Sequence, residues 1–335
     1  MPVRVAIDAM GGDFGPRPVL ESLKYLAQHE DLKIILVGDP ALLEEPLKDH
    51  PQVDLVPSGS VIEMNDSASV AIKKKSDSSI ALAVKLVRAG QADAALSPGH
   101  SGATMACAVT SLGRLEGVIR PAITTILPTG NHPIIVLDVG ANVDCKPEMF
   151  VDFAIMGTVY AEEVLGRSNP RVGLLSIGTE VKKGNEQTLA AYPLLAQAPI
   201  NFCGNMEGRQ VFGGSFDVVV CDGFVGNILL KFGEATAGHI YAELKDQIRQ
   251  VVSENAASAD LLKKTFETMF RRMDHEEYGG APLLGVNGTC LVCHGAASGR
   301  ALANAALIAA AAVRQNVNCR IVERLAMKQS LRTPA

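Results

Sequence analysis

Short apolar runs alternate with helical patterns along most of the chain. Six runs, rich in Val, Ile, Leu and Ala, each stop at a cluster of Gly, Asn, Ser, Thr or Asp. These runs are Val3–Asp8, Lys33–Val37, Ala92–Leu96, Pro133–Asp138, Arg171–Ser176 and Phe216–Cys221. Continuous apolar strands that alternate with helices are typical of a parallel sheet covered on both faces. The pattern therefore predicts a three-layer α/β/α fold with a largely parallel sheet.

Most of the glycine turns follow these predicted strands. In parallel α/β sheets, ligands lie beyond the carboxyl ends of the strands. The free N–H groups and the dipole of a helix that starts there favour an anion. We therefore expect the glycine turns to gather at one edge of the sheet and to bind a phosphate group.

Composition and charge narrow the classes of function. The chain has 335 residues, of which 47% are hydrophobic and 20% charged, and no Pro/Ser-rich linker divides it. We expect one catalytic domain over residues 1–335, with a protruding helical hairpin at 241–275. The net charge of −5 argues against a nucleic-acid partner. No secretion signal or membrane span is evident, so we expect a cytoplasmic protein with reduced cysteines.

The segment Ala92–Met105 combines a strand, a Ser/Gly loop and the start of a helix. Ser101 and Thr104 offer hydroxyl groups, and Gly102 lets the backbone approach an anion. The segment lacks the G-x-x-x-x-G-K-[ST] and G-x-G-x-x-G patterns, which argues against nucleotide hydrolysis and the standard dinucleotide fold. His100 is a candidate acid, base or phosphate donor, or an exposed loop residue.

Three further loops carry candidate polar groups. Asn142 follows the strand that ends at Asp138, and Lys183 lies in a Gly/Asn loop after Arg171–Ser176. A lysine in such a loop is well placed to meet a phosphate or an oxyanion. The third loop holds Asp222, Asn227 and Lys231. Asn227 and Lys231 are four residues apart and therefore share one helix face.

Residues 290–294 spell C-x-x-C-H, the attachment signature of c-type haem. Haem attachment needs an exported chain, and no second Cys/His pair has zinc-ligand spacing. We interpret the segment as a buried strand that ends in a functional turn at His294. The sequence therefore predicts no metal and no cofactor.

The stretch Tyr241–Met273 is predicted to form the protruding amphipathic hairpin. At about 100° per residue, its apolar side chains fall within one arc, with basic side chains outside it. The apolar side chains of this arc are compatible with three kinds of contact: with the packed core, with a second subunit of a dimer, or with an anionic membrane surface. The apolar candidates for membrane contact are Leu262, Phe266, Met269 and Phe270. The basic residues Lys263 and Arg271 lie outside the arc, and Lys73, Lys74 and Lys75 form a second basic cluster.

The order of these motifs resembles the bacterial phosphate acyltransferase family of phospholipid synthesis. The resemblance spans about residues 3 to 325 and rests on IDAMGGDFGP, KKKSDSS, SPGHSGA, LDVGAN, KGNE, GNMEGR, DVVVCDGFVGN and YGGAPLLGVNG. One departure concerns His100, because the family usually has Asn in the Ser-Ala-Gly-Asn-Thr-Gly-Ala segment. A second is the family's Glu-rich loop, which here reads Thr179-Glu180-Val181-Lys182.

The resemblance implies a reaction and a set of partners. Inorganic phosphate would attack the thioester of a long-chain acyl group on acyl carrier protein, giving acyl phosphate and free carrier thiol. The fold would be similar to that of isocitrate and isopropylmalate dehydrogenases and phosphotransacetylase, as a homodimer. The acyl phosphate would pass to a membrane glycerol-3-phosphate acyltransferase. The basic clusters would dock the acidic carrier protein.

These implications give each candidate residue an expected role. The Ser101–Thr104 turn, with Asn142 from the neighbouring strand end, would cradle phosphate. Lys183, Asn227 and Lys231 would stabilise negative charge, and Asp222 would orient a lysine or accept a phosphate proton. His294 or His100 would protonate the leaving thiolate. Three rival functions remain open: a phosphotransacetylase that uses small acyl-CoA, a decarboxylating dehydrogenase of the same fold, and a membrane-surface scaffold.

Overall fold

The structure, a computed structural model, describes residues 1–63, 66, 74–129, 132–254, 265 and 278–330. Within these residues, eleven strands form one sheet in the order β3-β2-β1-β4-β11-β10-β5-β6-β9-β7-β8. The strands are β1 Val3–Asp8, β2 Leu32–Gly38, β3 Asp54–Pro57, β4 Ala94–Ser97, β5 Ala122–Leu127, β6 Ile134–Leu137, β7 Arg171–Leu175, β8 Asn201–Met206, β9 Val218–Val220, β10 Ala281–Leu284 and β11 Thr289–Val292.

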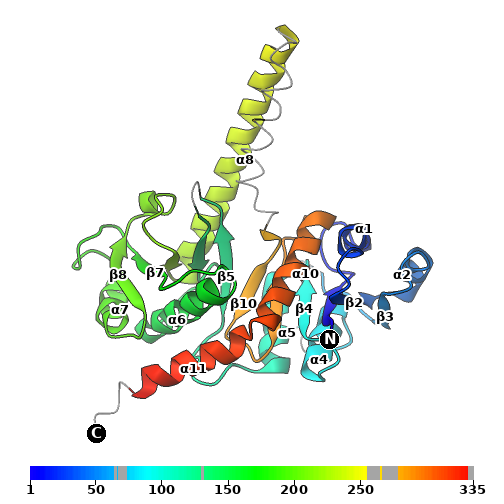
Figure 1. Cartoon of the computed structure of the whole chain (residues 1–335), viewed down its shortest axis with the longest axis horizontal. Coiled ribbons are helices and arrows are strands. Elements are labelled where there is room, and N and C mark those ends of the chain that lie inside the picture. The colour runs from blue at the N-terminus through cyan, green and yellow to red at the C-terminus, as the bar shows by residue number, and fades with distance from the viewer. Residues whose placement is uncertain (64–65, 67–73, 130–131, 255–264, 266–277, 331–335) are drawn as a thin grey trace.

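Helices cover both faces of this sheet (Figure 1). They are α1 Pro16–Leu26, α2 Pro40–Leu47, α4 Ser79–Arg88, α5 Ser101–Leu112, α6 Pro147–Glu163, α7 Glu186–Ala196, α8 Gly223–Glu254, α10 Gly299–Arg314 and α11 Val317–Ser330, with a short 3₁₀ helix at Gly208–Gln210. The largely parallel α/β fold predicted from the apolar runs is thereby confirmed.

Alternate residues of β1 pack into two different hydrophobic cores, one on each face of the sheet. On β1, Val5 and Ile7 belong to a core shared with α1 and α10, whereas Ala6 belongs to a core shared with α4 and α5. Because side chains alternate across a strand, a strand buried on both faces needs an apolar residue at nearly every position. This requirement explains the continuous apolar runs. In the other half of the sheet, α6, α7 and α11 contribute to a third core.

The sheet reverses direction near its middle, which the sequence did not predict. Strand β10 is antiparallel to both β11 and β5, and β5 is antiparallel to β6. The strands β6, β9, β7 and β8 are parallel to one another but run opposite to β1, β4 and β11. The carboxyl ends therefore lie at two different places. The expectation that all glycine turns gather at one edge is wrong.

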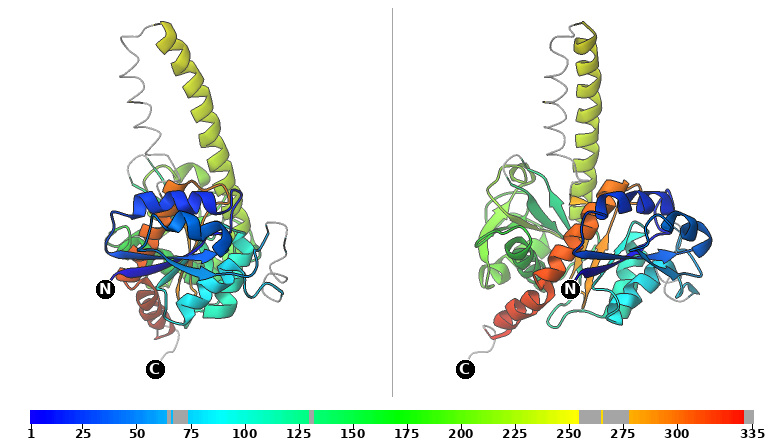
Figure 2. Two further views of the ribbon diagram at one scale, coloured as in Figure 1. Left: turned by 90° about the vertical axis from the view of Figure 1, so that its right-hand side faces the viewer. Right: turned by 45° about the vertical axis from the view of Figure 1, so that its right-hand side comes forward.

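Helix α8 leaves the body and projects outward (Figures 1 and 2). It is continuous over 32 residues, from Gly223 to Glu254. At about 1.5 Å per residue, this corresponds to roughly 48 Å. The first residue of α8 immediately follows the loop after β9. The start expected for the projecting segment, Tyr241, thus lies inside a helix that begins eighteen residues earlier, at the sheet.

Candidate active site

The loops after β6, β9, β7 and β8, together with the start of α8, are here called the β6 edge and hold five of the expected site residues. The four strands are parallel, with β9 between β6 and β7, so their carboxyl ends meet at this edge. Asn142 follows β6, Lys183 follows β7, and Asp222 follows β9. Asn227 and Lys231 lie in the first turns of α8. The structure thus brings these five residues to one edge of the sheet, without the Ser101–Thr104 turn that was expected beside Asn142.

Asp138 organises the turn after β6. Its buried carboxylate accepts hydrogen bonds from the backbone N–H groups of Ile123 (3.1 Å), Ala141 (3.0 Å) and Asn142 (2.6 Å). It also accepts one from Asn142 Nδ2 at 2.9 Å. Burial raises the pKa of Asp138 above its usual range, while these donors favour the charged form. The carboxylate therefore fixes the backbone and side chain of Asn142 together.

Asn142 links this turn to the start of β5. Its Nδ2 also donates to the carbonyl of Pro121 at 2.8 Å, and its Oδ1 accepts from Arg120 Nε at 3.1 Å. Arg120 was missed in the sequence because it precedes a strand instead of following one. Since β5 is antiparallel to β6, the amino end of β5 meets the carboxyl end of β6. The reversal of the sheet thus brings this cation into the site.

A cavity of about 470 Å³ opens beside Asn142. Arg120 and Lys146 line it as cations, and Asp144 is its one acidic lining residue. Ile119, Val143 and Met149 supply apolar wall. Two cations beside the start of α6 form a site suited to an anion, whereas both N–H groups of the Asn142 amide already have acceptors within the fold.

The start of α8 packs directly against the Asp138 turn. The N–H of Gly223 donates to the carbonyl of Asn142 at 2.7 Å. A Cβ atom on Gly223 would lie 2.6 Å from that same carbonyl oxygen, and one on Gly226 would lie 1.8 Å from the carbonyl oxygen of Asp138. Only glycine permits this approach, so the glycines expected to surround a ligand here serve helix packing.

Asp222 caps α8. Its carboxylate, which is 6% exposed, accepts a hydrogen bond from the N–H of Val225 at 2.9 Å. An aspartate in this position satisfies a free N–H of the first helical turn. The structure therefore gives Asp222 a helix-capping contact, whereas we had expected it to orient a lysine or take a proton.

Asn227 faces the turn after β6, and Lys231 lies one helical turn further along. A Cβ atom on Gly140 would lie 3.6 Å from Asn227 Oδ1, so the Asn227 amide stands over this glycine. Both side chains are exposed. Lys231 pairs with Glu234 of the same helix at 2.8 Å.

Hydrogen bonds to the backbone of Lys183 hold the loop in which this residue lies. The carbonyl of Lys183 accepts from Ser176 Oγ at 2.9 Å and from Asn205 Nδ2 at 3.3 Å. Its N–H donates to the carbonyl of Glu180 at 3.0 Å. The side chain itself is exposed. The loop thus fixes the position of Lys183 and leaves its ammonium group accessible.

A second group lies at the carboxyl ends of β1, β4 and β11, here called the β4 edge. The buried carboxylate of Asp8 accepts from Ser97 Oγ at 2.7 Å and from the N–H groups of Met10 (3.1 Å) and Gly11 (3.0 Å). Burial raises the pKa of Asp8 in spite of these donors. His294 follows β11, lies on this edge and is exposed. Its Nδ1 accepts from the N–H of Ala296 at 3.1 Å.

His100 caps the helix that begins at Ser101. Its Nδ1 accepts a hydrogen bond from the N–H of Ala103 at 3.1 Å. The buried hydroxyl of Thr104 donates to the carbonyl of His100 at 3.2 Å, so this hydroxyl is engaged within the helix. Ser101 is exposed and Gly102 partly exposed. The histidine thus fills the capping role for which asparagine is also suited.

The two edges do not meet as expected. Strands β11, β10 and β5 separate β4 from β6, and β4 and β6 run in opposite directions. At about 4.8 Å per step, the two strands lie roughly 19 Å apart in the sheet. The placement of Asn142 on a strand next to the Ser101 turn is therefore wrong.

The basic cluster at 73–75 is only partly described. Lys74 is exposed. Lys75 donates to the carbonyl of Val61 at 2.7 Å and pairs with Asp66 at 2.6 Å, which lowers the pKa of Asp66. The remaining expected contact residues lie outside the described part of the chain: Lys73, Leu262, Lys263, Phe266, Met269, Phe270 and Arg271.

The C-x-x-C-H segment begins in β11 and ends in the loop that follows it. Cys290 and Cys293 are buried free thiols, and burial raises the pKa of Cys290 to about 12. Among the described residues, no three His, Cys, Asp or Glu side chains are grouped so as to hold a metal ion. In the same part of the chain, no helix combines the length and the apolar character needed to cross a membrane.

Known proteins share this fold, and others share much of this sequence. The EutD phosphotransacetylase of Staphylococcus aureus matches with a TM-score of 0.62 at 16% identity, over 93% of this chain and 94% of that chain, and so shows the fold. The phosphate acyltransferase of Heliobacterium modesticaldum is 45% identical over 329 residues, covering 96% of this chain and 98% of its own. The phosphate acyltransferase of Desulforudis audaxviator is 46% identical over 318 residues, covering 94% of each chain.

A protein family matches almost the same part of the chain as these relatives do. The family described as fatty acid synthesis protein matches residues 3–320. Together with the relatives, this range includes both sheet edges and all of the described candidate residues. The chain therefore belongs to this fatty acid synthesis protein family.

Proposed function

We propose that the chain is an enzyme that transfers a long-chain fatty acyl group from acyl carrier protein to inorganic phosphate. The observation that carries this proposal is its similarity, over nearly the whole chain, to proteins named phosphate acyltransferase. The cationic cavity beside Asn142 and the exposed Lys183 and Asn227 suit the chemistry. The product, acyl phosphate, would serve phospholipid synthesis.

The reaction needs position and charge more than an activated nucleophile. A phosphate oxygen attacks the thioester carbonyl carbon, the C–O bond forms, and the C–S bond breaks to release the carrier thiolate. Holding the two reactants in line contributes on the order of 7–11 kcal/mol, and one oxyanion donor about 3–4 kcal/mol. A thiol with a pKa near 8.5 leaves readily, so help from His294 or His100 is a minor part of the proposal.

Lys183 and Asn227 are proposed to stabilise the oxyanion, with Lys231 adding charge. Both come from the β6 edge, and neither side chain is buried in the fold. Phosphate is proposed to bind near Asn142, with Arg120 and Lys146 as partners. Ser101 and Gly102 at the β4 edge are the rival phosphate ligands, now separated from the Asn142 that was expected to bind phosphate together with the Ser101–Thr104 turn. Alanine substitutions of Arg120 and Ser101 distinguish the two places through the KM for phosphate.

Acyl-phosphate formation from palmitoyl-acyl carrier protein and phosphate tests the assignment. Lys183→Ala and Asn227→Ala should each lower the rate at least tenfold. Lys182→Ala is the matched control, because it removes a lysine from the same loop, and it should stay near the wild-type rate. Circular dichroism confirms folding. Near wild-type rates for both site variants would remove this site from the proposal.

The donor is proposed to be the acidic acyl carrier protein. The exposed Lys74 and its neighbours, together with Lys263 and Arg271, would supply the positive docking surface. Exposed charge pairs weaken as salt rises. The rate with palmitoyl-acyl carrier protein should therefore fall with ionic strength and exceed the rate with acetyl-CoA. A preference for acetyl-CoA would favour the phosphotransacetylase alternative.

Assembly as a homodimer and contact with a membrane complete the proposal. The first turns of α8 expose Phe224, Ile228 and Phe232, which fall on one helical face and are 58%, 52% and 70% exposed. Such a face is suited to a second copy of the chain. The expected apolar residues of 262–270 would meet the membrane surface and a glycerol-3-phosphate acyltransferase there. Light scattering and sedimentation with anionic liposomes measure the two interactions separately.

A further inference from the structure

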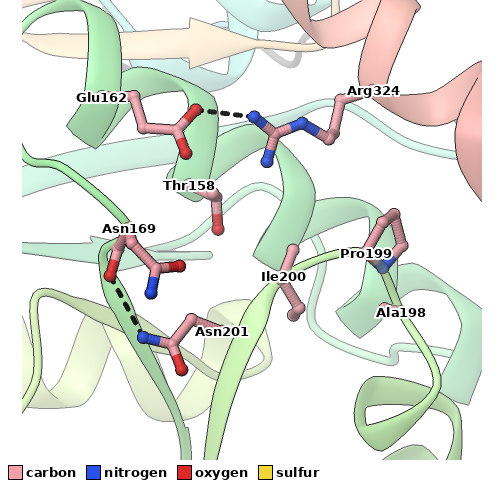
Figure 3. A pocket seen from close by; sticks show the side chains of 8 residues that line it. All are labelled: Thr158, Glu162, Asn169, Ala198, Pro199, Ile200, Asn201 and Arg324. Carbon is pink, nitrogen blue, oxygen red and sulfur yellow. Dashed lines mark hydrogen bonds and ion pairs between the residues drawn. The ribbon is translucent and has the colours of Figure 1, made fainter.

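A polar cavity of about 390 Å³ lies at the amino ends of β7 and β8 (Figure 3). The last turns of α6, the segments that enter the two strands, and α11 surround it. Lys183 and Asn205 lie at the carboxyl ends of these strands, so the cavity is at the other end of the sheet from the proposed active site. No part of the proposed reaction uses it.

Thr158 supplies a hydroxyl group without a partner. Its side chain is 1% exposed, and its buried Oγ1 has no hydrogen-bond partner among the described residues. An unpaired buried hydroxyl is costly, and native proteins contain few. Figure 3 shows that this oxygen points into the cavity. A ligand in the cavity would provide the missing partner.

Arg324 presents donors to the same space. One terminal nitrogen of its guanidinium pairs with Glu162 at 2.8 Å, with the two side chains 27% and 26% exposed. Its other terminal nitrogen is directed toward the cavity (Figure 3). An arginine held by one carboxylate keeps its remaining N–H groups in a fixed plane, which suits a second carboxylate.

The opposite wall adds an amide and an apolar surface. The amide of Asn169 faces the cavity (Figure 3). Asn201 Nδ2 donates to the backbone carbonyl of Asn169 at 3.1 Å, which holds this loop in place. Ile200 and its two preceding neighbours line the remaining side. The cavity thus offers anion donors, a donor–acceptor amide and a small apolar wall.

We propose that this cavity binds a small hydroxycarboxylate. The carboxylate would bind the free N–H groups of Arg324 and the hydroxyl of Thr158, and the ligand hydroxyl would bind the Asn169 amide. The charges of Arg324 and Glu162 cancel, so a singly charged ligand fits better than a phosphate dianion. The volume lies within the range of small-molecule sites.

Binding of L-lactate, followed by NMR titration of the full chain, tests this proposal. Lactamide, a neutral isostere, and propionate, which lacks the hydroxyl, should each bind at least tenfold more weakly. Thr158→Val and Arg324→Gln should weaken lactate binding at least tenfold. Thr124→Val is the matched control: Thr124 is also fully buried with an unpaired hydroxyl, but it lies in β5 and does not line the cavity. It should bind lactate like the wild type.

Urea unfolding separates lost binding from lost folding. Thr158→Val removes an unpaired hydroxyl, so its unfolding midpoint without ligand should be no lower than that of the wild type. Failure of lactate to bind the wild type would overturn the proposal. Equal binding of lactate and lactamide, or wild-type binding by Thr158→Val, would do so as well. Binding is measured without turnover, so the outcome is independent of the proposed activity.

Discussion

The contact between α8 and the Asp138 turn gives a sharp prediction for Gly226→Ala. The new Cβ atom would lie 1.8 Å from the carbonyl oxygen of Asp138, where ordinary contact begins near 3.4 Å. The helix would have to move by about 3.4 − 1.8 = 1.6 Å. That movement also strains the 2.7 Å hydrogen bond from Gly223 to Asn142.

The expected cost follows from these two effects. Overpacking a tight contact costs about 1–3 kcal/mol, and loss of one hydrogen bond about 1 kcal/mol. Gly226→Ala should therefore lower the free energy of unfolding by about 2–4 kcal/mol. It should also reduce acyl-phosphate formation, because Asn227 moves with the helix.

Gly238→Ala is the matched control on the same helix. A Cβ atom there meets nothing within 4 Å, and Gly238 is exposed. Alanine favours a helix interior over glycine by about 0.8–1.0 kcal/mol, so this variant should be more stable than the wild type. Urea unfolding monitored by circular dichroism measures both variants. Equal midpoints for Gly226→Ala and the wild type would refute the tight contact.

Two further predictions concern a helix cap and a surface ion pair. His100→Ala should destabilise the fold by about 1 kcal/mol, because the N–H of Ala103 loses its acceptor. His100→Asn should keep the wild-type unfolding midpoint, because asparagine can also cap the helix. Equal unfolding midpoints for the two variants would contradict the cap. The Arg4 guanidinium bonded to Asp93 holds the pKa of that carboxyl below its usual range. The carboxylate therefore stabilises the fold above the unfolded-state pKa of about 3.9, and the effect is lost as pH falls through the lower folded-state value. Asp93→Asn should lower the unfolding midpoint at neutral pH but not at pH near 2, and a pH-independent difference would disprove the linkage.

The sequence was informative where local chemistry decides structure. Apolar runs located β1, β4, β6, β7 and β9 because strands buried on both faces require continuous apolar residues. The polar residues that follow β6, β7 and β9 were correctly assigned to loops at strand ends. These are short-range relationships between a residue and its neighbours in the chain.

The reversal of the sheet was not predictable in the same way. It depends on β10, which pairs with the neighbouring strand β11 through Leu291 on one side and with the distant strand β5 through Ile123 on the other. For that reason Arg120, before β5, was missed, and Ser101 was placed beside Asn142. Asp222 was expected to orient a lysine or to accept a phosphate proton. The residues next to it in the sequence do not reveal which backbone N–H donates a hydrogen bond to its carboxylate. In the structure that N–H belongs to Val225.

Because α8 is one continuous helix, a tilt at its base displaces its far end. Its first two turns contact the Asp138 turn and carry Asn227, and its described end at Glu254 lies about 48 Å away. A tilt of about 5° at the sheet would move that end by roughly 4 Å over this length. A small shift of the helix at Gly226 therefore produces a larger displacement at the Glu254 end. Conversely, a partner that restrains the far end of the helix also restrains the position of the Asn227 amide.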